Sequence, residues 1–335
     1  MPLLAAAENR ADFVDIDVPS WAWIALVLTI VAMGAIDLYR HRDDHEPTAR
    51  EALGESIVWI LCALAFAGIV AFAWGSQAFG EYMSGYLIEK SLSVDNVFVW
   101  SMIFTAMAIP IRYQHRVLFW GIFGALAMRA AFVFLGSALI TRFWWLLLVF
   151  GVFLVYTGLK VIRHRDDEGT HGATRSVALL RRIMPVTDEL DGHSFFTVRN
   201  GVRTATPLFA ALVVVEATDF VFAVDSVPAI LAVSREPFLV FACNAFAIFG
   251  LRAMYFLLAD AKKRFHYLSH ALGGILVFVG IKMTISHWYH LNTYVSLSII
   301  LTMLFGAVVA SRLRDGRSGN GTAATAVHRS IERRS

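Results

Sequence analysis

Hydrophobic residues occur along this chain in long runs separated by short polar stretches. A helix that crosses the hydrocarbon core of a bilayer needs about 20 mostly apolar residues. Nine segments meet that length or come close to it: residues 21–39, 53–74, 82–106, 115–139, 143–162, 207–233, 238–258, 268–287 and 295–310. The pattern predicts an all-α, polytopic membrane protein with nine transmembrane helices.

Two of these runs carry acidic side chains well inside their length. Residues 82–106 contain Glu89 and Asp95, and residues 207–233 contain Glu216, Asp219 and Asp225. An ionisable side chain near the centre of a membrane helix costs about 2.5–3.5 kcal/mol on insertion scales. We therefore expect these carboxylates to require partner side chains, water or an ion.

Composition agrees with a membrane protein. The 335 residues are 58% hydrophobic and only 16% charged, and the mean hydropathy is +0.62. The net charge of +3 does not indicate a nucleic-acid partner, because the charges lie in blocks between apolar runs. Cys62 and Cys243 both fall in apolar runs and are too few for a disulfide framework or a thiolate metal site.

Lysine and arginine are concentrated in alternate connections, which predicts the orientation of the chain. Residues 1–20 are then an exposed extracytoplasmic tail, residues 21–310 the transmembrane domain and residues 311–335 a basic cytoplasmic tail. The long connection 163–206 lies in the cytoplasm. We interpret it as a solvated linker, with a regulatory or metal-sensing role as the alternative.

Short sequence matches indicate an internal repeat. Residues 95–98 (DNVF) resemble 219–222 (DFVF), 122–124 (IFG) equals 248–250, and 154–160 (LVYTGLK) resembles 276–282 (LVFVGIK). The offsets of 124, 126 and 122 residues relate a first repeat, 82–162, to a second, 207–287. Since each repeat has three helices, the second enters the membrane from the opposite side, an inverted arrangement found in secondary transporters.

Pro228 predicts a break in the second acidic helix, close to Asp225 and Ser226. Proline removes a backbone donor and disfavours helix in the residue before it. Asp225 lies nine positions from Glu216, about half a turn away around an ideal helix. It therefore joins the same site only if the helix unwinds near Pro228.

The candidate ligands are all hard oxygen donors. Glu89, Ser93 and Asn96 share one helix face, with Asp95 on its flank, and Glu216 and Asp219 share another. Such donors favour Mn²⁺, Mg²⁺ or Ca²⁺ over Zn²⁺ or Cu⁺. The predicted metal ligands are Glu89, Asp95, Asn96, Glu216, Asp219 and Asp225, and the further polar residues of the pathway are Ser93, Ser226 and Asn244.

Ion pairing within the membrane is the alternative explanation for these acids. Five carboxylates face four intramembrane bases: Lys90, Arg129, Arg252 and Lys282. Lys282 can extend to the interface, whereas Arg129 and Arg252 lie deep in their helices, so we expect these two arginines to be the structural partners. The catalytic motifs His-Glu-x-x-His and Gly-x-Ser-x-Gly and a Gly-rich phosphate loop do not occur, so we expect no enzyme and no cofactor.

Four stretches resemble the TerC family of integral membrane proteins, and in particular its Alx branch: residues 89–96 (EKSLSVDN), 112–121 (RYQHRVLFWG), 216–230 (EATDFVFAVDSVPAI) and 244–255 (NAFAIFGLRAMY). The resemblance extends over about residues 21–310. It implies a member of the LysE transporter superfamily in the bacterial inner membrane, linked to Mn²⁺ export and, by name, to tellurite resistance. The family's acidic motifs fall on the residues already singled out, together with Ser226.

These observations give three functional hypotheses. The first is a Mn²⁺ exporter coupled to protons, because a buried carboxylate that releases its cation tends to take up a proton. Its partners would be the lipid bilayer, the divalent cation and protons. The second is a scaffold without transport activity whose cytoplasmic loop recruits partners in stress responses or membrane insertion. The third, tellurite handling through Arg129 and Arg252, conflicts with the nearby surplus of acids.

Overall fold

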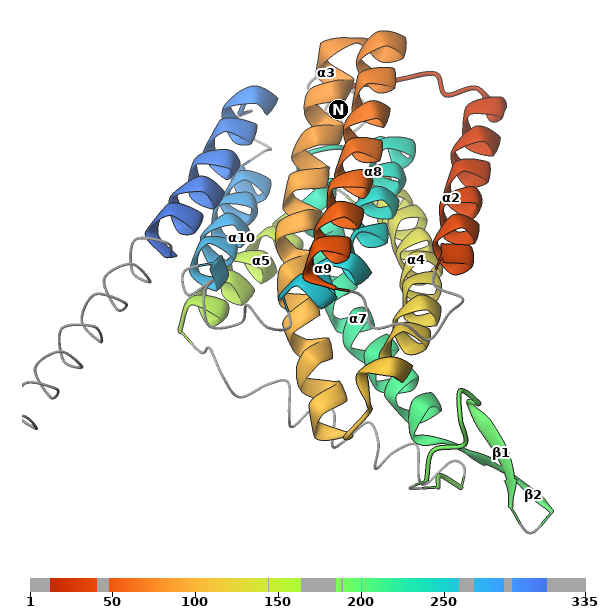
Figure 1. Cartoon of the computed structure of the whole chain (residues 1–335). Helices are drawn as coiled ribbons and strands as arrows, with labels where there is room; N and C mark the ends of the chain where they lie inside the picture. Colours follow the sequence, from red (N-terminus) through yellow and green to blue (C-terminus); the bar gives the residue numbers. More distant parts are fainter. Residues whose placement is uncertain are drawn as a thin grey trace, which may run out of the picture.

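The computed structural model shows a bundle of long helices with one small hairpin at its edge (Figure 1). It describes residues 13–40, 48–143, 145–163, 185–187, 189–199, 201–258, 268–285 and 291–311. The helices are α2 (Ser20–Arg40), α3 (Ala49–Ala106), α4 (Ile111–Arg142), α5 (Leu146–Arg163), α7 (Pro207–Leu231), α8 (Pro237–Phe249), α9 (Leu251–Leu258), α10 (Leu268–Ile285) and an unlabelled C-terminal helix (Thr293–Ser311).

Helix α3 consists of two helices that fold back on each other at Gly75. Its start is fixed by a capping box between Thr48 and Glu51. Gly75 has φ 87° and ψ −178°, a conformation outside the helical region that glycine adopts readily. The Tyr82 hydroxyl donates to the Ala63 carbonyl at 3.2 Å across the two halves. The predicted spans 53–74 and 82–106 therefore lie in separate halves of one hairpin (Figure 1).

The second half of α3 forms the centre of the bundle with α4, α7 and α8. Residues Phe238 to Phe249 of α8 are all buried, in keeping with a helix that is apolar around its circumference apart from Asn244. The peripheral helices instead expose apolar side chains; Phe72 in the first half of α3, for example, is 96% exposed. An apolar outer face suits helices whose surroundings are lipid rather than water.

Helices α5 and α10 pack against each other through glycines. Atoms added at the Cβ positions of Gly151 and Gly158 would lie 2.8 Å from the Gly280 carbonyl oxygen and 2.6 Å from that of Gly273. Both are backbone contacts that flexible side chains cannot relieve. Small residues let helix backbones approach closely in membranes, so these glycines set the distance between the two helices.

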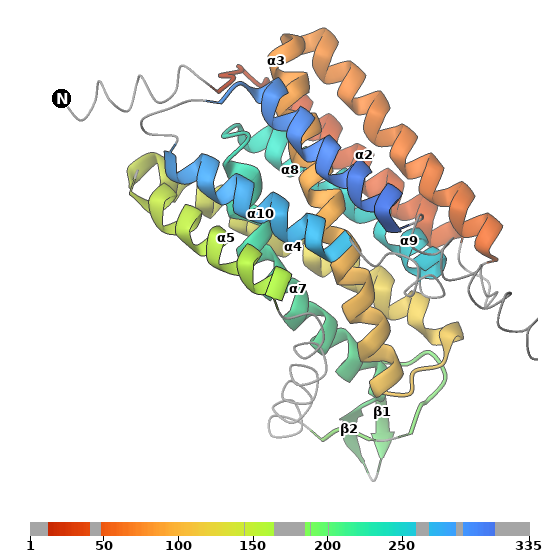
Figure 2. The same ribbon diagram turned by 90° about the vertical axis from the view of Figure 1, so that its left-hand side faces the viewer.

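A short antiparallel hairpin lies in the predicted linker. Strands β1 (Phe196–Arg199) and β2 (Val202–Ala205) pair with Phe196 opposite Ala205, and Gly201 adopts φ 78° at the turn. The hairpin projects beyond the N-terminal end of α7 (Figures 1 and 2). Arg116 of α4 lies over the ring of Phe195, so this part of the linker is packed against the bundle.

The predicted break at Pro228 is wrong. Helix α7 is continuous from Pro207 to Leu231 with Pro228 inside it. Pro228 lies in the last turn, where its carbonyl still accepts from the Ala232 N–H at 3.0 Å, and Val227, Ala229 and Ile230 around it are buried. Packing of that turn outweighs the single backbone hydrogen bond that proline removes.

The all-helical membrane class is confirmed. Six helices of the described residues are long and apolar enough to cross a membrane, one of them spanning α8 and α9. That count treats most of α3 as one span and leaves out α5 and α10, which have 18 residues each. Nine crossings and the inverted repeat stay predictions. So do the domain limits, although Val14, Ile16 and Val18 of the predicted exposed tail pack on the core.

Candidate functional site

Polar side chains from α3, α4, α7 and α8 meet inside the bundle around Arg129. This arginine, on α4, is only 2% exposed. Its Nη1 forms an ion pair with Glu89 Oε1 of α3 and donates to Asn244 Oδ1 of α8 at 2.9 Å and to Ser226 Oγ of α7 at 3.2 Å. One guanidinium thus links four helices that are far apart in the sequence.

Asp219 on α7 belongs to the same group. It is 1% exposed, and the charges of Arg129, Glu216 and Glu89 all act on it. Trp100 of α3 lies beside it, but the indole N–H does not reach hydrogen-bond geometry. Within the described part of the chain, neither carboxylate oxygen of Asp219 has a hydrogen-bond partner.

The face of α3 that carries Glu89 continues with Ser93, Asn96 and Trp100, at intervals of four, three and four residues. Ser93 and Asn96 are buried, and their side-chain polar atoms, like Glu89 Oε2, have no partner among the described residues. Buried polar groups in proteins are nearly always hydrogen-bonded to protein or to water. Unpartnered oxygens on Glu89, Ser93, Asn96 and Asp219 therefore point to a ligand or water between α3 and α7.

Glu216 lies next to this cluster and is half-buried. Gly124 of α4 provides its space, because a methyl group added there would overlap the Glu216 carboxylate. Lys90 is directed elsewhere: its Nζ lies 3.5 Å from the Ala247 carbonyl, beside Gly250. Arg129 is the base in direct contact with the central acids, and the charge of Lys90 also acts on Glu89. With Glu216 included, three described carboxylates face these two bases.

Not every predicted residue is placed by the structure. The backbones of Asp95 and Asp225 are helical, but their side chains lie outside what the structure describes. Among the described residues, no group of three or more His, Cys, Asp or Glu side chains is arranged to hold a metal ion. The described part of the site therefore offers two central carboxylates with neutral oxygen donors, and Glu216 beside them.

Arg252 does not join this group. On α9, it donates to Asp37 Oδ1 of α2 at 2.5 Å, and Glu55 and Arg40 lie in the same network. Asp37 and Glu55 could not be recognised from the sequence as partners, because both lie within a few residues of the end of a predicted span and resemble ordinary interfacial charges. The sequence feature that could have indicated this pair is an arginine deep in one predicted span, Arg252, together with an acid near the end of another, Asp37.

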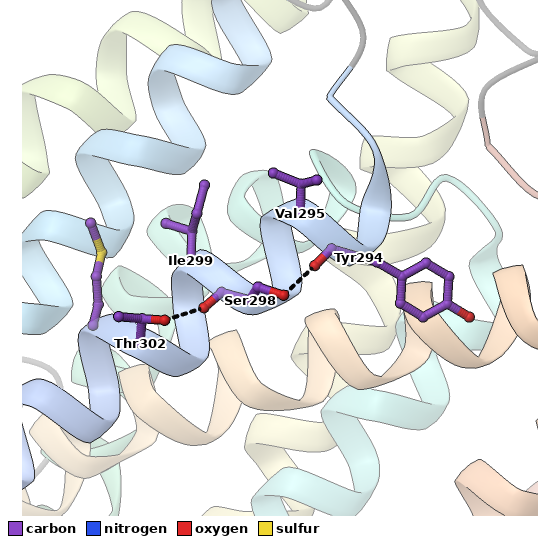
Figure 3. A pocket seen from close by; sticks show the side chains of 6 residues that line it. Tyr294, Val295, Ser298, Ile299 and Thr302 are labelled. Atoms are coloured by element: carbon purple, nitrogen blue, oxygen red, sulfur yellow. Dashed lines mark hydrogen bonds between the residues drawn. The ribbon is translucent and has the colours of Figure 1, made fainter.

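The C-terminal helix carries a shallow apolar groove of about 530 Å³ lined by Tyr294, Val295, Ser298, Ile299, Thr302 and Met303 (Figure 3). Its hydroxyls already have partners, and that of Tyr294 donates to the Ser76 carbonyl of α3 at 2.6 Å. Ser298 donates to the Tyr294 carbonyl at 2.8 Å, and Thr302 donates to the Ser298 carbonyl at 2.7 Å. The groove therefore offers little polar recognition, unlike the interior cluster around Arg129.

The apolar helices and the buried polar centre define an integral membrane protein with a candidate site inside its helix bundle. The chain belongs to the integral membrane protein TerC family. The sequence model of this family matches residues 74–318. This confirms the family resemblance.

Relatives align over most of their length. An uncharacterized membrane protein of Myxococcus xanthus is 48% identical over 293 residues, covering 87% of this chain and 92% of its own. The Escherichia coli K12 protein named "Putative membrane-bound redox modulator Alx" is 43% identical over 295 residues, covering 85% and 91%. A Rickettsia bellii membrane protein is 37% identical over 296 residues, covering 88% and 97%. No solved structure matches the chain.

Proposed function

We propose that this protein is a secondary transporter that exports a divalent cation, Mn²⁺ in the first instance, from the cytoplasm through the site between α3 and α7. The observation that carries the proposal is the set of buried oxygens without partners on Glu89, Ser93, Asn96 and Asp219. A hard divalent cation takes six or more oxygen ligands, and these atoms supply several of them. Asp95, Asp225 and Glu216 are the further acids proposed for the pathway.

The packing of α5 on α10 supports the inverted repeat in this proposal. The repeat offset of 122 residues relates Gly151 to Gly273 and Gly158 to Gly280. In the structure Gly151 contacts Gly280, and Gly158 contacts Gly273. If each glycine is replaced by its counterpart in the other repeat, the first contact becomes the second. A two-fold axis in the membrane plane has that effect, and transporters of this design bind substrate where the repeats meet.

Direction and coupling complete the proposal. Export and Mn²⁺ are what the TerC resemblance implies. The excess of basic residues in alternate loops supports an orientation with the N-terminus outside and the C-terminus in the cytoplasm of a bacterial inner membrane. Proton antiport fits carboxylates that become unpaired once the cation leaves.

A membrane scaffold is the second candidate, favoured by the buried ion pairs Glu89–Arg129 and Asp37–Arg252. In a scaffold, Asp225→Asn would lower the folded yield, and the purified protein would not bind Mn²⁺. Transport measurements separate the two candidates.

Mn²⁺ uptake by a variant at Asp219 tests the transporter proposal. We expect Asp219→Asn to reduce the uptake of radiolabelled Mn²⁺ into inverted vesicles at least about tenfold, because it removes a ligand charge while preserving shape. Uptake is compared at equal protein amounts, with and without an imposed pH gradient. The exposed Asp191→Asn change is the matched control. Equal uptake by Asp219→Asn and the unsubstituted protein would contradict the transporter proposal.

Gly124→Ala tests the role of Glu216 without removing it. The added methyl group overlaps the end of a flexible side chain, so we expect the carboxylate to move at little cost in folding while Mn²⁺ uptake falls about tenfold or more. Gly68→Ala, where nothing lies within 4 Å, should leave uptake unchanged. In a Glu216→Ala background the Gly124 substitution should have no further effect; a second, independent loss there would show that Glu216 is not the cause.

A further inference from the structure

Glu81 is a buried carboxylate that the central site does not use. It lies on α3 and is 0% exposed. Its Oε1 accepts the backbone N–H of Val14 at 2.7 Å, and its Oε2 accepts the Ser234 hydroxyl at 2.8 Å. Gln77, one turn earlier, and the charge of Lys282 on α10 also act on it. Glu81 thus joins α3, the segment before α2 and the connection between α7 and α8.

The segment before α2 is attached to the same connection a second time. The Arg235 guanidinium lies 4.6 Å from the centre of the Phe13 ring. Val14, Ile16 and Val18 pack against the core, and the segment lies at the end of the bundle where α3 reverses (Figure 2). Residues 13–19 therefore form a strap across one end of the bundle, and Glu81 is bonded directly to it.

Glu81 lies on the same face of α3 as the central site. Positions 81, 85, 89, 93 and 96 follow one another at helical intervals of four or three. Glu81 and Glu89 are eight residues apart, or about 12 Å along the axis. A polar side chain near one end of the bundle is thus aligned with the buried oxygens at its centre.

Tightly packed atoms separate the two carboxylates. An atom added at the Cβ position of Gly85 would lie 2.8 Å from Cys243 Sγ of α8 and 3.3 Å from Ile230 Cγ2 of α7. Cys243 and Ile230 are both buried. Between Glu81 and Glu89 the structure is therefore closed by direct contact of α3 with α7 and α8, and Ile230 is only four residues from Ser234, which Glu81 binds.

The geometry points to Glu81 as the latch of a gate between the central site and the end of the bundle that carries the strap. Release of its hydrogen bonds to Val14 and Ser234 frees the strap and the end of α7, separates Ile230 and Cys243 from Gly85, and exposes a carboxylate to a passing cation. The inference rests on the proposed function, because it assigns this end of the transport pathway to a named residue.

The thiol of Cys243 reports the state of this gate directly. In a Cys62→Ser background it is the single thiol of the chain. We expect Glu81→Ala and Ser234→Ala to raise the rate at which a cationic methanethiosulfonate reagent, added on the side of the N-terminus, modifies Cys243. The rise should be at least about tenfold, the ratio that corresponds to loss of one hydrogen bond to a charged group. Reagent added from the opposite side should show no such rise.

Glu55→Gln is the matched control, because Glu55 is another buried carboxylate of α3 and lies in the Arg252 network. Unchanged Cys243 rates in both latch variants, or an equal rise in Glu55→Gln, would overturn the gate. Mn²⁺ uptake by the unsubstituted protein separates the two proposals. If Cys243 is labelled faster in the latch variants but the unsubstituted protein takes up no Mn²⁺, the gate proposal stands and the proposed cargo is wrong. If labelling is unchanged in the latch variants and the unsubstituted protein takes up Mn²⁺, the gate proposal alone is wrong.

Discussion

Replacement of Arg129 by methionine is expected to destabilise the protein by roughly 3–5 kcal/mol, because it leaves a buried carboxylate without its counter-charge. Glu89 is 0% exposed and pairs with Arg129, which also donates to Ser226 and Asn244. A single change therefore removes the polar contacts that α4 makes with α3, α7 and α8 through this residue. The free energy of unfolding in mixed detergent micelles measures the effect.

Two further variants identify the cause. Arg142→Met, at the exposed end of α4, should change stability by less than about 0.5 kcal/mol. The double variant Arg129→Met, Glu89→Met should recover most of the lost stability, because a buried ion pair can be replaced by apolar side chains, but Mn²⁺ uptake should remain lost. If the double variant is as unstable as Arg129→Met alone, the uncompensated Glu89 charge is not the reason.

The centre of the site could be anticipated from the sequence because the membrane makes polar residues conspicuous. Glu89 and Asp219 stand out in apolar runs, and helical spacing placed Ser93 and Asn96 on the face of Glu89. Spacing along one helix does not show which helix lies opposite. The contact of Arg129 with Ser226 and Asn244 depends on tertiary packing of α4 against α7 and α8.

Residues near helix ends were harder to interpret. Glu81 lies immediately before the predicted span 82–106 and Asp37 near the end of 21–39, positions where charges ordinarily face water. In the structure both are buried, Glu81 beneath Val14 and Asp37 against Arg252. Their burial results from segments distant in sequence that cover the ends of the helices, and hydrophobic periodicity contains no information about such cover.

Local propensity also failed in two places, for different reasons. Pro228 predicted a break, but packing in the last turn of α7 keeps the helix intact. The hairpin of β1 and β2 was missed because each strand has only four residues, too few to show a clear alternation. Its stability comes partly from contacts outside the strands, such as Phe196 with Phe209 of α7 at 4.5 Å between ring centres.

Alanine at Gly158 is expected to destabilise the protein by roughly 1–3 kcal/mol, the usual cost of overpacking. The added methyl group would lie 2.6 Å from the Gly273 carbonyl oxygen and 2.9 Å from the Val277 nitrogen. Because these are backbone atoms, relief requires α5 and α10 to separate. Valine at the same position should cost more than alanine, since its branched side chain needs more space.

Alanine at Gly54 or Gly306 is the matched control and should have the opposite sign. Nothing lies within 4 Å of an added Cβ at either position, and alanine in a helix interior is favoured over glycine by about 0.5–1 kcal/mol. Gly280→Ala, the repeat counterpart of Gly158→Ala, meets the Gly151 carbonyl oxygen at 2.7 Å and should cost a similar amount. The free energies of unfolding of the four variants test whether α5 and α10 are in backbone contact. If Gly158→Ala stabilises the protein as much as Gly54→Ala does, they are not.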